Sequence, residues 1–289
     1  MAHRLPRNLP HQKDITPKSA CQNSVATISW SHAELLCASG VFVVALLLYS
    51  WTLAPTVTLV DSGELIVAAR GLGVAHPPGF PLWIMLAHFA SLLPFGNVAA
   101  RINFSSAFFA ALACAMLTLV MIELLVTASY AGARERQKKL AKQARKFEDS
   151  TGSNFPIFAP GVGAGLLLAF SRTLWSYATI TEVYTLNALL ILLVFFLVVR
   201  WRRRIIETRT HSRGAVTTYD TWIYAAAFVF GLALGVHHVT MALTLPAVAA
   251  VVYRTQGLKF FASRRLLYTA LISIGALIVV YSYLPWAAS

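Results

Sequence analysis

Acidic residues are scarce in this chain, which carries 11 Asp and Glu against 24 Lys and Arg over 289 residues, for a net charge of +13. All charged residues together make up only 12% of the sequence, about half of what a soluble domain usually carries. Hydrophobic residues make up 57%, and the mean hydropathy is +0.65. This balance excludes an ordinary soluble domain and indicates a membrane protein.

Other common signals of function are also missing. The cysteines Cys21, Cys37 and Cys114 have neither metal-ligand nor disulfide spacing, and the last two fall in apolar runs that predict packing roles. No basic stretch alternates with aromatic residues, so no nucleic-acid partner is predicted. The chain also has no glycine-rich phosphate loop and no evident internal repeat, which argues against a nucleotide-dependent enzyme and a repeat-built transporter.

The positive charges lie in four blocks separated by apolar runs. Apart from Arg70, Arg101 and Arg172, every Lys and Arg falls within residues 1–34, 131–147, 200–213 or 254–265. Basic segments beside apolar spans mark the cytoplasmic side of a membrane, where they also meet anionic headgroups. We therefore predict a multi-pass protein of a bacterial-type inner membrane, with a cytoplasmic tail over 1–34, a transmembrane domain over 35–286, and cytoplasmic loops over 128–156, 200–221 and 254–265.

The apolar runs predict an all-α polytopic bundle of about seven transmembrane helices. Five clear spans cover 35–53, 102–127, 157–175, 183–199 and 266–283. Residues 222–253 are too long for one span and predict two short helices that meet at His237 and His238. Residues 82–95 are short for a span and predict an interfacial or re-entrant helix on the outer side. The basic linker 131–148 predicts a separate cytoplasmic helix on the headgroup surface.

This topology gathers four distant polar segments on the outer face. They are the first outer loop 55–81, which reaches 101 if residues 82–95 do not cross, the turn 176–182, the histidine pair, and residues 283–286. A site built from them would face away from the cytoplasm.

Asp61 and Glu64 lie three residues apart at the start of an amphipathic stretch, which places both carboxylates on one helical face. One interpretation is a capping box, in which Asp61 caps the helix and Glu64 bonds back to its start. The other is a carboxylate that acts as general base or electrostatic stabiliser at the membrane surface. Both can hold, with Glu64 capping and Asp61 free.

His76 lies in the same predicted loop and precedes a stiff Pro77-Pro78-Gly79-Phe80-Pro81 turn. It is either a hydrogen-bond partner or a catalytic group. Glu182, Tyr184 and Asn187 begin the span 183–199. They are either headgroup-region residues or, as the depth of Asn187 favours, one wall of a cavity.

Adjacent histidines cannot share one helical face, so His237 and His238 do not predict a two-histidine metal clamp. One is expected to face the cavity and the other to pack or reach the surface. Of the three outer arginines, Arg70 and Arg172 are candidates to hold a phosphate, with Arg172 favoured because it lies close to Glu182 in the sequence. Glu123, inside a span, is given no role.

The stretch from Asp61-Ser62-Gly63-Glu64 to His76-Pro77-Pro78-Gly79-Phe80-Pro81-Leu82 resembles a family of polytopic membrane proteins long labelled a domain of unknown function. That family includes an animal transmembrane O-mannosyltransferase that acts on plexin-type domains. Weaker supporting motifs are Glu182-Val183-Tyr184-Thr185-Leu186-Asn187, Gly235-Val236-His237-His238-Val239-Thr240 and Tyr283-Leu284-Pro285. Family members usually continue beyond the last motif, so the chain is expected to lack the family's carboxy-terminal part.

The resemblance implies a glycosyltransferase of the GT-C superfold that moves a sugar from a polyprenyl-phosphate donor to a protein or glycan acceptor at the outer face. It implies Asp61 as the base, with Glu64 and His76 as further site residues. No cofactor is required, although Asp61 and Glu64 allow a divalent metal. The other hypothesis is a non-catalytic transporter or assembly subunit in the same membrane, since polar residues inside membranes also mark permeation paths.

Overall fold

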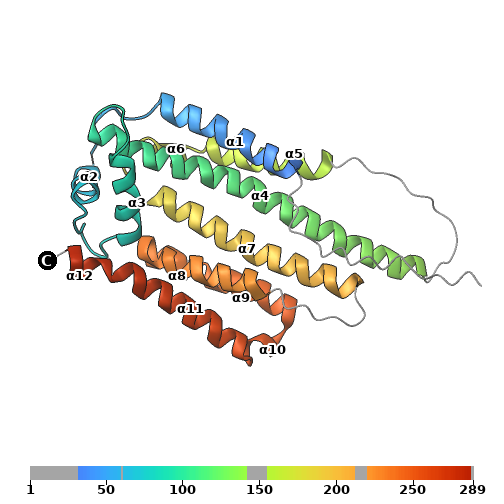
Figure 1. Ribbon diagram of the computed structural model, residues 1–289. Coiled ribbons are helices and arrows are strands. Elements are labelled where there is room, and N and C mark those ends of the chain that lie inside the picture. The colour runs from blue at the N-terminus through green and yellow to red at the C-terminus, as the bar shows by residue number, and fades with distance from the viewer. Residues whose placement is uncertain (1–31, 60, 142–154, 212–219, 288–289) are drawn as a thin grey trace, which may run out of the picture. The chain divides into compact units, whose positions relative to one another are not determined.

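The computed structural model describes residues 32–59, 61–141, 155–211 and 220–287, and every regular element within them is a helix (Figure 1). The predicted tail over 1–34 therefore lies almost wholly outside the described residues. The helices are α1 (His32–Trp51), α2 (Ser62–Gly71), α3 (Pro81–Ser91), α4 (Val98–Ala141), α5 (Phe155–Ala169), α6 (Arg172–Ala178), α7 (Tyr184–His211), α8 (Asp220–Ala242), α9 (Leu245–Gln256), α10 (Leu258–Phe261), α11 (Arg264–Tyr281) and α12 (Tyr283–Ala287).

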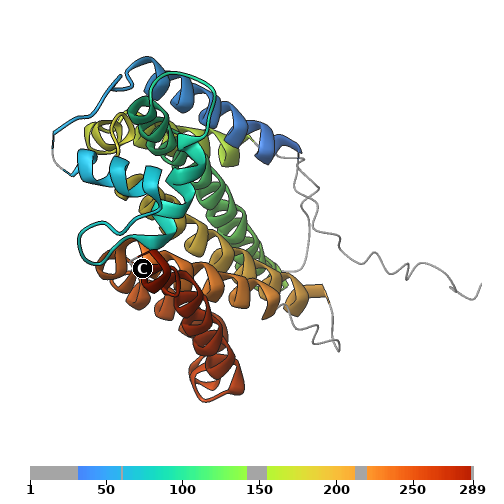
Figure 2. The same cartoon turned by 60° about the vertical axis from the view of Figure 1, so that its left-hand side comes forward.

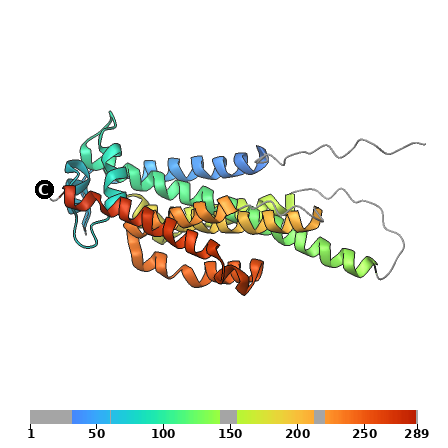
Figure 3. The same ribbon diagram turned by 60° about the horizontal axis from the view of Figure 1, so that its bottom comes forward.

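Five helices in the described part of the chain are long and apolar enough to cross a membrane, which confirms an all-α polytopic membrane protein. They are His32–Trp51, Val98–Ser129, Tyr184–Thr208, Asp220–Ala242 and Arg264–Ala287. The predicted α5 and α9 crossings have only 15 and 12 residues, fewer than the roughly 20 that a span needs. The count of seven crossings stays a prediction. The short α3 lies at one end of the long helices, as expected of a helix that does not cross (Figures 1 and 3).

Two predicted boundaries were wrong, and one predicted region contains a second break, each because a local signal was missed. The 157–175 span breaks at Ser171, whose side chain caps α6 by accepting the Leu174 N–H at 3.3 Å. Within residues 222–253, two helical segments do meet at the histidines, where His237 has non-helical φ and ψ, and a second break at residues 243–244 was missed, where Pro246 suits the first turn of α9. The linker over 131–148 is not a separate surface helix, since α4 continues unbroken to Ala141.

Small residues let the membrane helices pack closely. Ala107, Ala110, Ala111 and Cys114 of α4 are buried against α1, as the apolar setting of Cys114 predicted. A Cβ on Gly231 would collide with the Ser273 carbonyl of α11, so glycine permits the close α8–α11 crossing.

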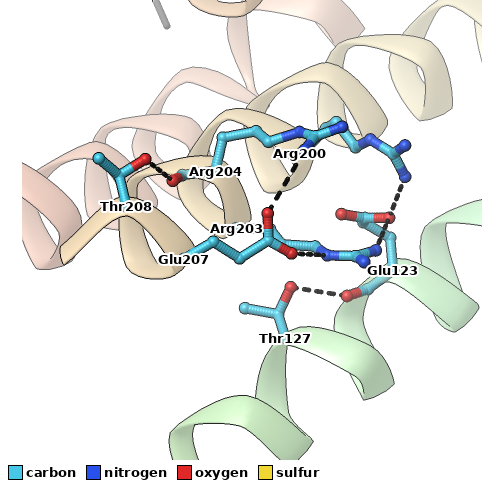
Figure 4. A network of polar contacts seen from close by, with 7 residues as sticks. All are labelled: Glu123, Thr127, Arg200, Arg203, Arg204, Glu207 and Thr208. Atoms are coloured by element: carbon cyan, nitrogen blue, oxygen red, sulfur yellow. Dashed lines mark hydrogen bonds and ion pairs between the residues drawn. The ribbon is translucent and has the colours of Figure 1, made fainter. Parts of the chain in front are cut away.

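Glu123 of α4 is buried in an ion network with α7 (Figure 4). Its side chain is 2% exposed, and its Oε2 lies 2.7 Å from Nη1 of Arg200 and 3.1 Å from Nη1 of Arg203. Arg203 in turn bonds Glu207 through Nε at 2.8 Å. This role could not be predicted from sequence, because nothing local links residue 123 to residue 200. The network ties the two helices together at the basic end.

Candidate functional site

The residues predicted from sequence to form a site lie at the end of the bundle opposite the basic blocks. There α2 and α3 lie across the ends of the long helices, next to α6, the start of α7 and the α8–α9 turn (Figures 1 and 2). The start of α1, the far end of α4 and α10 all lie at the opposite end. The helix directions thus place the four predicted polar segments together.

Asp61, Glu64 and His76 come into contact within the first loop. Glu64 Oε1 accepts the His76 backbone N–H at 2.5 Å, and Glu64 Oε2 lies 3.2 Å from His76 Nδ1. The other ring nitrogen, Nε2, lies 4.0 Å from Asp61 Oδ2. Glu64 therefore orients the imidazole so that its free nitrogen faces the Asp61 carboxylate.

This geometry excludes one of the two interpretations of the Asp61–Glu64 pair, the capping box. Asp61 occupies the N-cap position of α2, but its side chain makes no capping hydrogen bond. Glu64 bonds to His76 instead of the start of the helix, so no capping box forms. The Asp61 side chain is 55% exposed, and it is accessible to a ligand.

The turn after His76 is held in an unusual backbone conformation. Gly79 has φ of 90° and Phe80 has φ of 44°, both in the left-handed region that non-glycine residues rarely adopt. A Cβ on Gly79 would lie 3.1 Å from the Leu284 side chain, and Tyr283 donates its hydroxyl to the Gly73 carbonyl at 3.1 Å. The 283–285 motif therefore supports the loop that carries His76.

Glu182 lies next to this group and is buried, with 5% exposure. Ser106 of α4 holds its backbone by accepting the Glu182 N–H at 3.1 Å and donating to the Glu182 carbonyl at 3.3 Å. Burial raises the pKa of the Glu182 carboxyl above its ordinary value of 4.5, and repulsion from Asp61 adds to that rise. The Val183 N–H and His76 partly oppose the rise in this pKa.

Asn103 links the segment that follows α1 to the segment that precedes α7, and it was not identified from the sequence. Its amide donates to the carbonyls of Ala54 at 2.8 Å and Thr56 at 3.1 Å, and its Oδ1 accepts the Thr181 hydroxyl. The side chain is fully buried. An Asn inside an apolar span requires partners, and that signal could have identified it.

Tyr184, Asn187 and His237 form a second connected group. Asn187 donates to the Thr240 hydroxyl at 2.9 Å, which is the kind of pairing that its depth in the span required. The same hydroxyl lies 3.1 Å from His237 Nδ1, and the Tyr184 and His237 ring centroids are 5.7 Å apart. These contacts join the start of α7 to α8.

The histidine pair departs from regular helix geometry. His237 has φ of −154° and ψ of 89°, which kinks α8. The His237 and His238 rings lie nearly parallel, with centroids 6.4 Å apart. The expectation that one histidine faces the cavity and the other packs or reaches the surface stays a prediction.

The three arginines outside the basic blocks differ in their contacts. Arg101 donates to the carbonyls of Ser91, Phe95 and Gly96, so it stabilises the turn after α3. Arg70 reaches Ser91 Oγ at 3.4 Å. Arg172 begins α6, is exposed, and has no hydrogen bond or ion pair within the described residues. The phosphate-binding roles of Arg70 and Arg172 stay predictions.

The described residues contain no group of three or more His, Cys, Asp or Glu side chains placed to hold a metal ion. The divalent metal that the sequence allows at Asp61 and Glu64 stays a prediction.

We expect Glu182→Gln to raise thermal stability at pH 7. The raised pKa means that the folded chain binds this proton more tightly than the unfolded chain, so the stabilising contribution is complete below pH 4.5 and is lost as pH rises through the folded-state pKa. The neutral amide removes that loss. In melting curves from pH 4 to 8, the melting temperature of the variant should therefore increase relative to that of wild type as pH rises. A variant that melts lower than wild type at pH 7 but not at pH 4 would contradict this.

Comparison with known proteins gives a consistent result. Residues 61–259 match the family model described as the protein O-mannosyl-transferase TMEM260 N-terminal domain. A Mus musculus protein named protein O-mannosyl-transferase TMEM260 is 30% identical over 257 residues, covering 89% of this chain and 31% of the mouse protein. A Dictyostelium discoideum protein of the same name is 27% identical over 218 residues, covering 74% of this chain and 23% of that protein. The chain spans less than a third of either relative, and no solved structure matches it.

Proposed function

The chain belongs to the family of the protein O-mannosyl-transferase TMEM260 N-terminal domain, and on that premise we propose that it takes part in moving mannose from a polyprenyl-phosphate carrier to a protein hydroxyl. The reaction occurs at the non-cytoplasmic end of a GT-C-like bundle. The proximity of Asp61, His76 and Glu182 at the end away from the basic blocks carries this proposal.

Asp61 acts as the general base in this proposal. Its exposed carboxylate takes the proton of the acceptor hydroxyl while that oxygen attacks the anomeric carbon of the sugar. The bond from that carbon to the phosphate oxygen breaks, and the electron pair leaves with the polyprenyl phosphate. Attack opposite the leaving group inverts the anomeric centre.

Glu64, His76 and Glu182 set the electrostatics around the base. Glu64 fixes His76, and the imidazole Nε2 at 4.0 Å orients the Asp61 carboxylate. Glu182 is nearly buried, and its raised pKa favours the protonated form as the pH falls, so it can donate a hydrogen bond to sugar or phosphate oxygen.

The leaving phosphate requires a cation, and the outer arginines provide candidates. Arg172 is exposed and has no partner within the described residues, so its guanidinium is available for two parallel hydrogen bonds to phosphate. Arg70 is the second candidate, because Ser91 at 3.4 Å holds it only weakly.

Transfer in reconstituted vesicles tests the proposal. The purified chain, a polyprenyl-phosphate mannose donor and a serine- and threonine-bearing peptide are combined, and mannosylated peptide and free polyprenyl phosphate are measured. We expect equal amounts of the two products. Folded protein that gives neither product, or that moves the carrier across the bilayer without cleaving it, would contradict transfer and favour the transporter hypothesis.

A further inference from the structure

A cavity of about 420 Å³ lies among α7, α8, α9, α10 and α11, and none of the site residues described above lines it. The only side-chain hydroxyls on its wall belong to Thr269 and Ser273. These already donate to the carbonyls of Leu266 and Ala227, both at 2.7 Å. The remaining lining is aliphatic and aromatic, and the volume falls within the range of about 300–1,000 Å³ typical of ligand sites. The cavity therefore suits a hydrocarbon chain.

The cavity extends along the short helix α9 into the basic end of the bundle. Leu245 lines it at the start of α9, and Phe260 and Phe261 of α10 line it at the other end. α10 lies at the basic end in Figures 1 and 3, beyond the last turn of α9. A chain held in the cavity can therefore place a polar headgroup at the cytoplasmic interface.

Three cations lie close in the sequence to residues that line that end of the cavity. Lys259 directly precedes the two lining phenylalanines, Arg254 lies two residues after the lining Val252, and Arg264 lies two residues before the lining Leu266. All three side chains are exposed, and none makes an ion pair or hydrogen bond within the described residues. By contrast, the neighbouring Arg265 is paired with Asp220 at 3.2 Å. The unpaired positive charge favours an anionic ligand.

We propose that the cavity binds an anionic phospholipid of the cytoplasmic leaflet. One acyl chain fills the space beside α9, and the headgroup phosphate lies against Arg254, Lys259 and Arg264. Burial of the chain supplies affinity, and the three cations supply the preference for an anionic headgroup. The lipid would hold α9 and α10 against α11 at the end opposite the sugar-transfer site.

Native mass spectrometry of the delipidated full chain tests this proposal. Phosphatidylglycerol and phosphatidylcholine with identical acyl chains are added in turn, and the bound fraction is measured. We expect about tenfold tighter retention of phosphatidylglycerol, since each cation near the headgroup contributes to the attraction. Equal retention of the two lipids, or no retention of either, would overturn the proposal.

Matched variants distinguish the contribution of the lipid headgroup from that of the acyl chain. Arg254→Gln, Lys259→Gln and Arg264→Gln together should abolish the preference. The same loss of charge in α4, through Arg134→Gln, Lys138→Gln and Lys139→Gln, should keep it, since α4 contributes no residue to the cavity. Ala249→Phe, and independently Ala270→Phe, should block binding of both lipids while unchanged circular dichroism shows that the chain is folded. Lipid binding that is unchanged in both Ala249→Phe and Ala270→Phe would contradict the assignment. So would displacement of phosphatidylglycerol by equimolar polyprenyl phosphate.

Discussion

Asp61→Asn is expected to lower sugar transfer by about 10²- to 10⁴-fold, the usual contribution of a positioned general base. The amide has almost the same shape as the carboxylate but cannot take the acceptor proton. Because the side chain makes no capping bond and is 55% exposed, the substitution should leave the fold intact. The measurement is the initial rate of peptide mannosylation in vesicles, with thermal melting as the check on folding.

Two further variants show whether the loss is specific to Asp61. Glu34→Gln removes a carboxylate from α1 at the opposite end of the bundle and should leave the rate unchanged. His76→Asn should lower the rate less than Asp61→Asn, because His76 acts through Asp61. A folded Asp61→Asn protein with full activity would refute the assigned base, and loss confined to His76→Asn would transfer that role to the histidine.

Glu123→Ala is expected to destabilise the bundle by about 3–5 kcal/mol, the usual consequence of removing one member of a buried ion pair. The Glu123 and Arg200 side chains are 2% and 3% exposed, so the alanine would leave a buried guanidinium without its closest carboxylate. Arg203 would lose a contact as well, although it keeps Glu207. Unfolding in mixed micelles of increasing denaturing detergent measures the change.

The same network provides its own controls. Glu207→Ala removes a carboxylate that is 22% exposed, and we expect a loss of only about 0–1 kcal/mol. Glu123→Leu combined with Arg200→Met removes both charges and should be far closer to wild type than Glu123→Ala. If Glu123→Ala lowered the free energy of unfolding no more than Glu207→Ala, the contacts between α4 and α7 in Figure 4 would not stabilise the bundle as proposed.

Most of the arrangement of the helices could be predicted from the amino-acid sequence, because the charge and hydropathy of each segment can be read without knowing its distant neighbours. The positive blocks predicted which helix ends lie together, and the long apolar runs predicted four of the five long spans, whereas Asp220–Ala242 was predicted as part of two short helices. That was enough to place Asp61, His76 and Glu182 at one end. The Asp61–Glu64 spacing, however, suited both a capping box and a site, and only the contact of Glu64 with His76 in the structure excluded the capping box.

The residues that hold the site in place could not be predicted in the same way. Asn103 contacts residues 54, 56 and 181, and Glu123 contacts residues 200 and 203, so their roles depend on which helices pack side by side. In the sequence such positions are recognisable only as polar residues inside apolar runs. That pattern predicts that each needs a partner, but it does not say which residue the partner is.

Side-specific labelling of single cysteines tests the central claim most directly. In a background without the three native cysteines, cysteine replaces Asp61, Tyr184 or His238 at the site, or Arg254 or Lys259 at the basic end, all of them exposed positions. The account predicts that an impermeant maleimide added from the non-cytoplasmic side labels positions 61, 184 and 238. Positions 254 and 259 should react only once the membrane is opened. Labelling of positions 61 and 184 from opposite sides would show that Asp61 and Glu182 lie on different sides of the membrane and do not share a site.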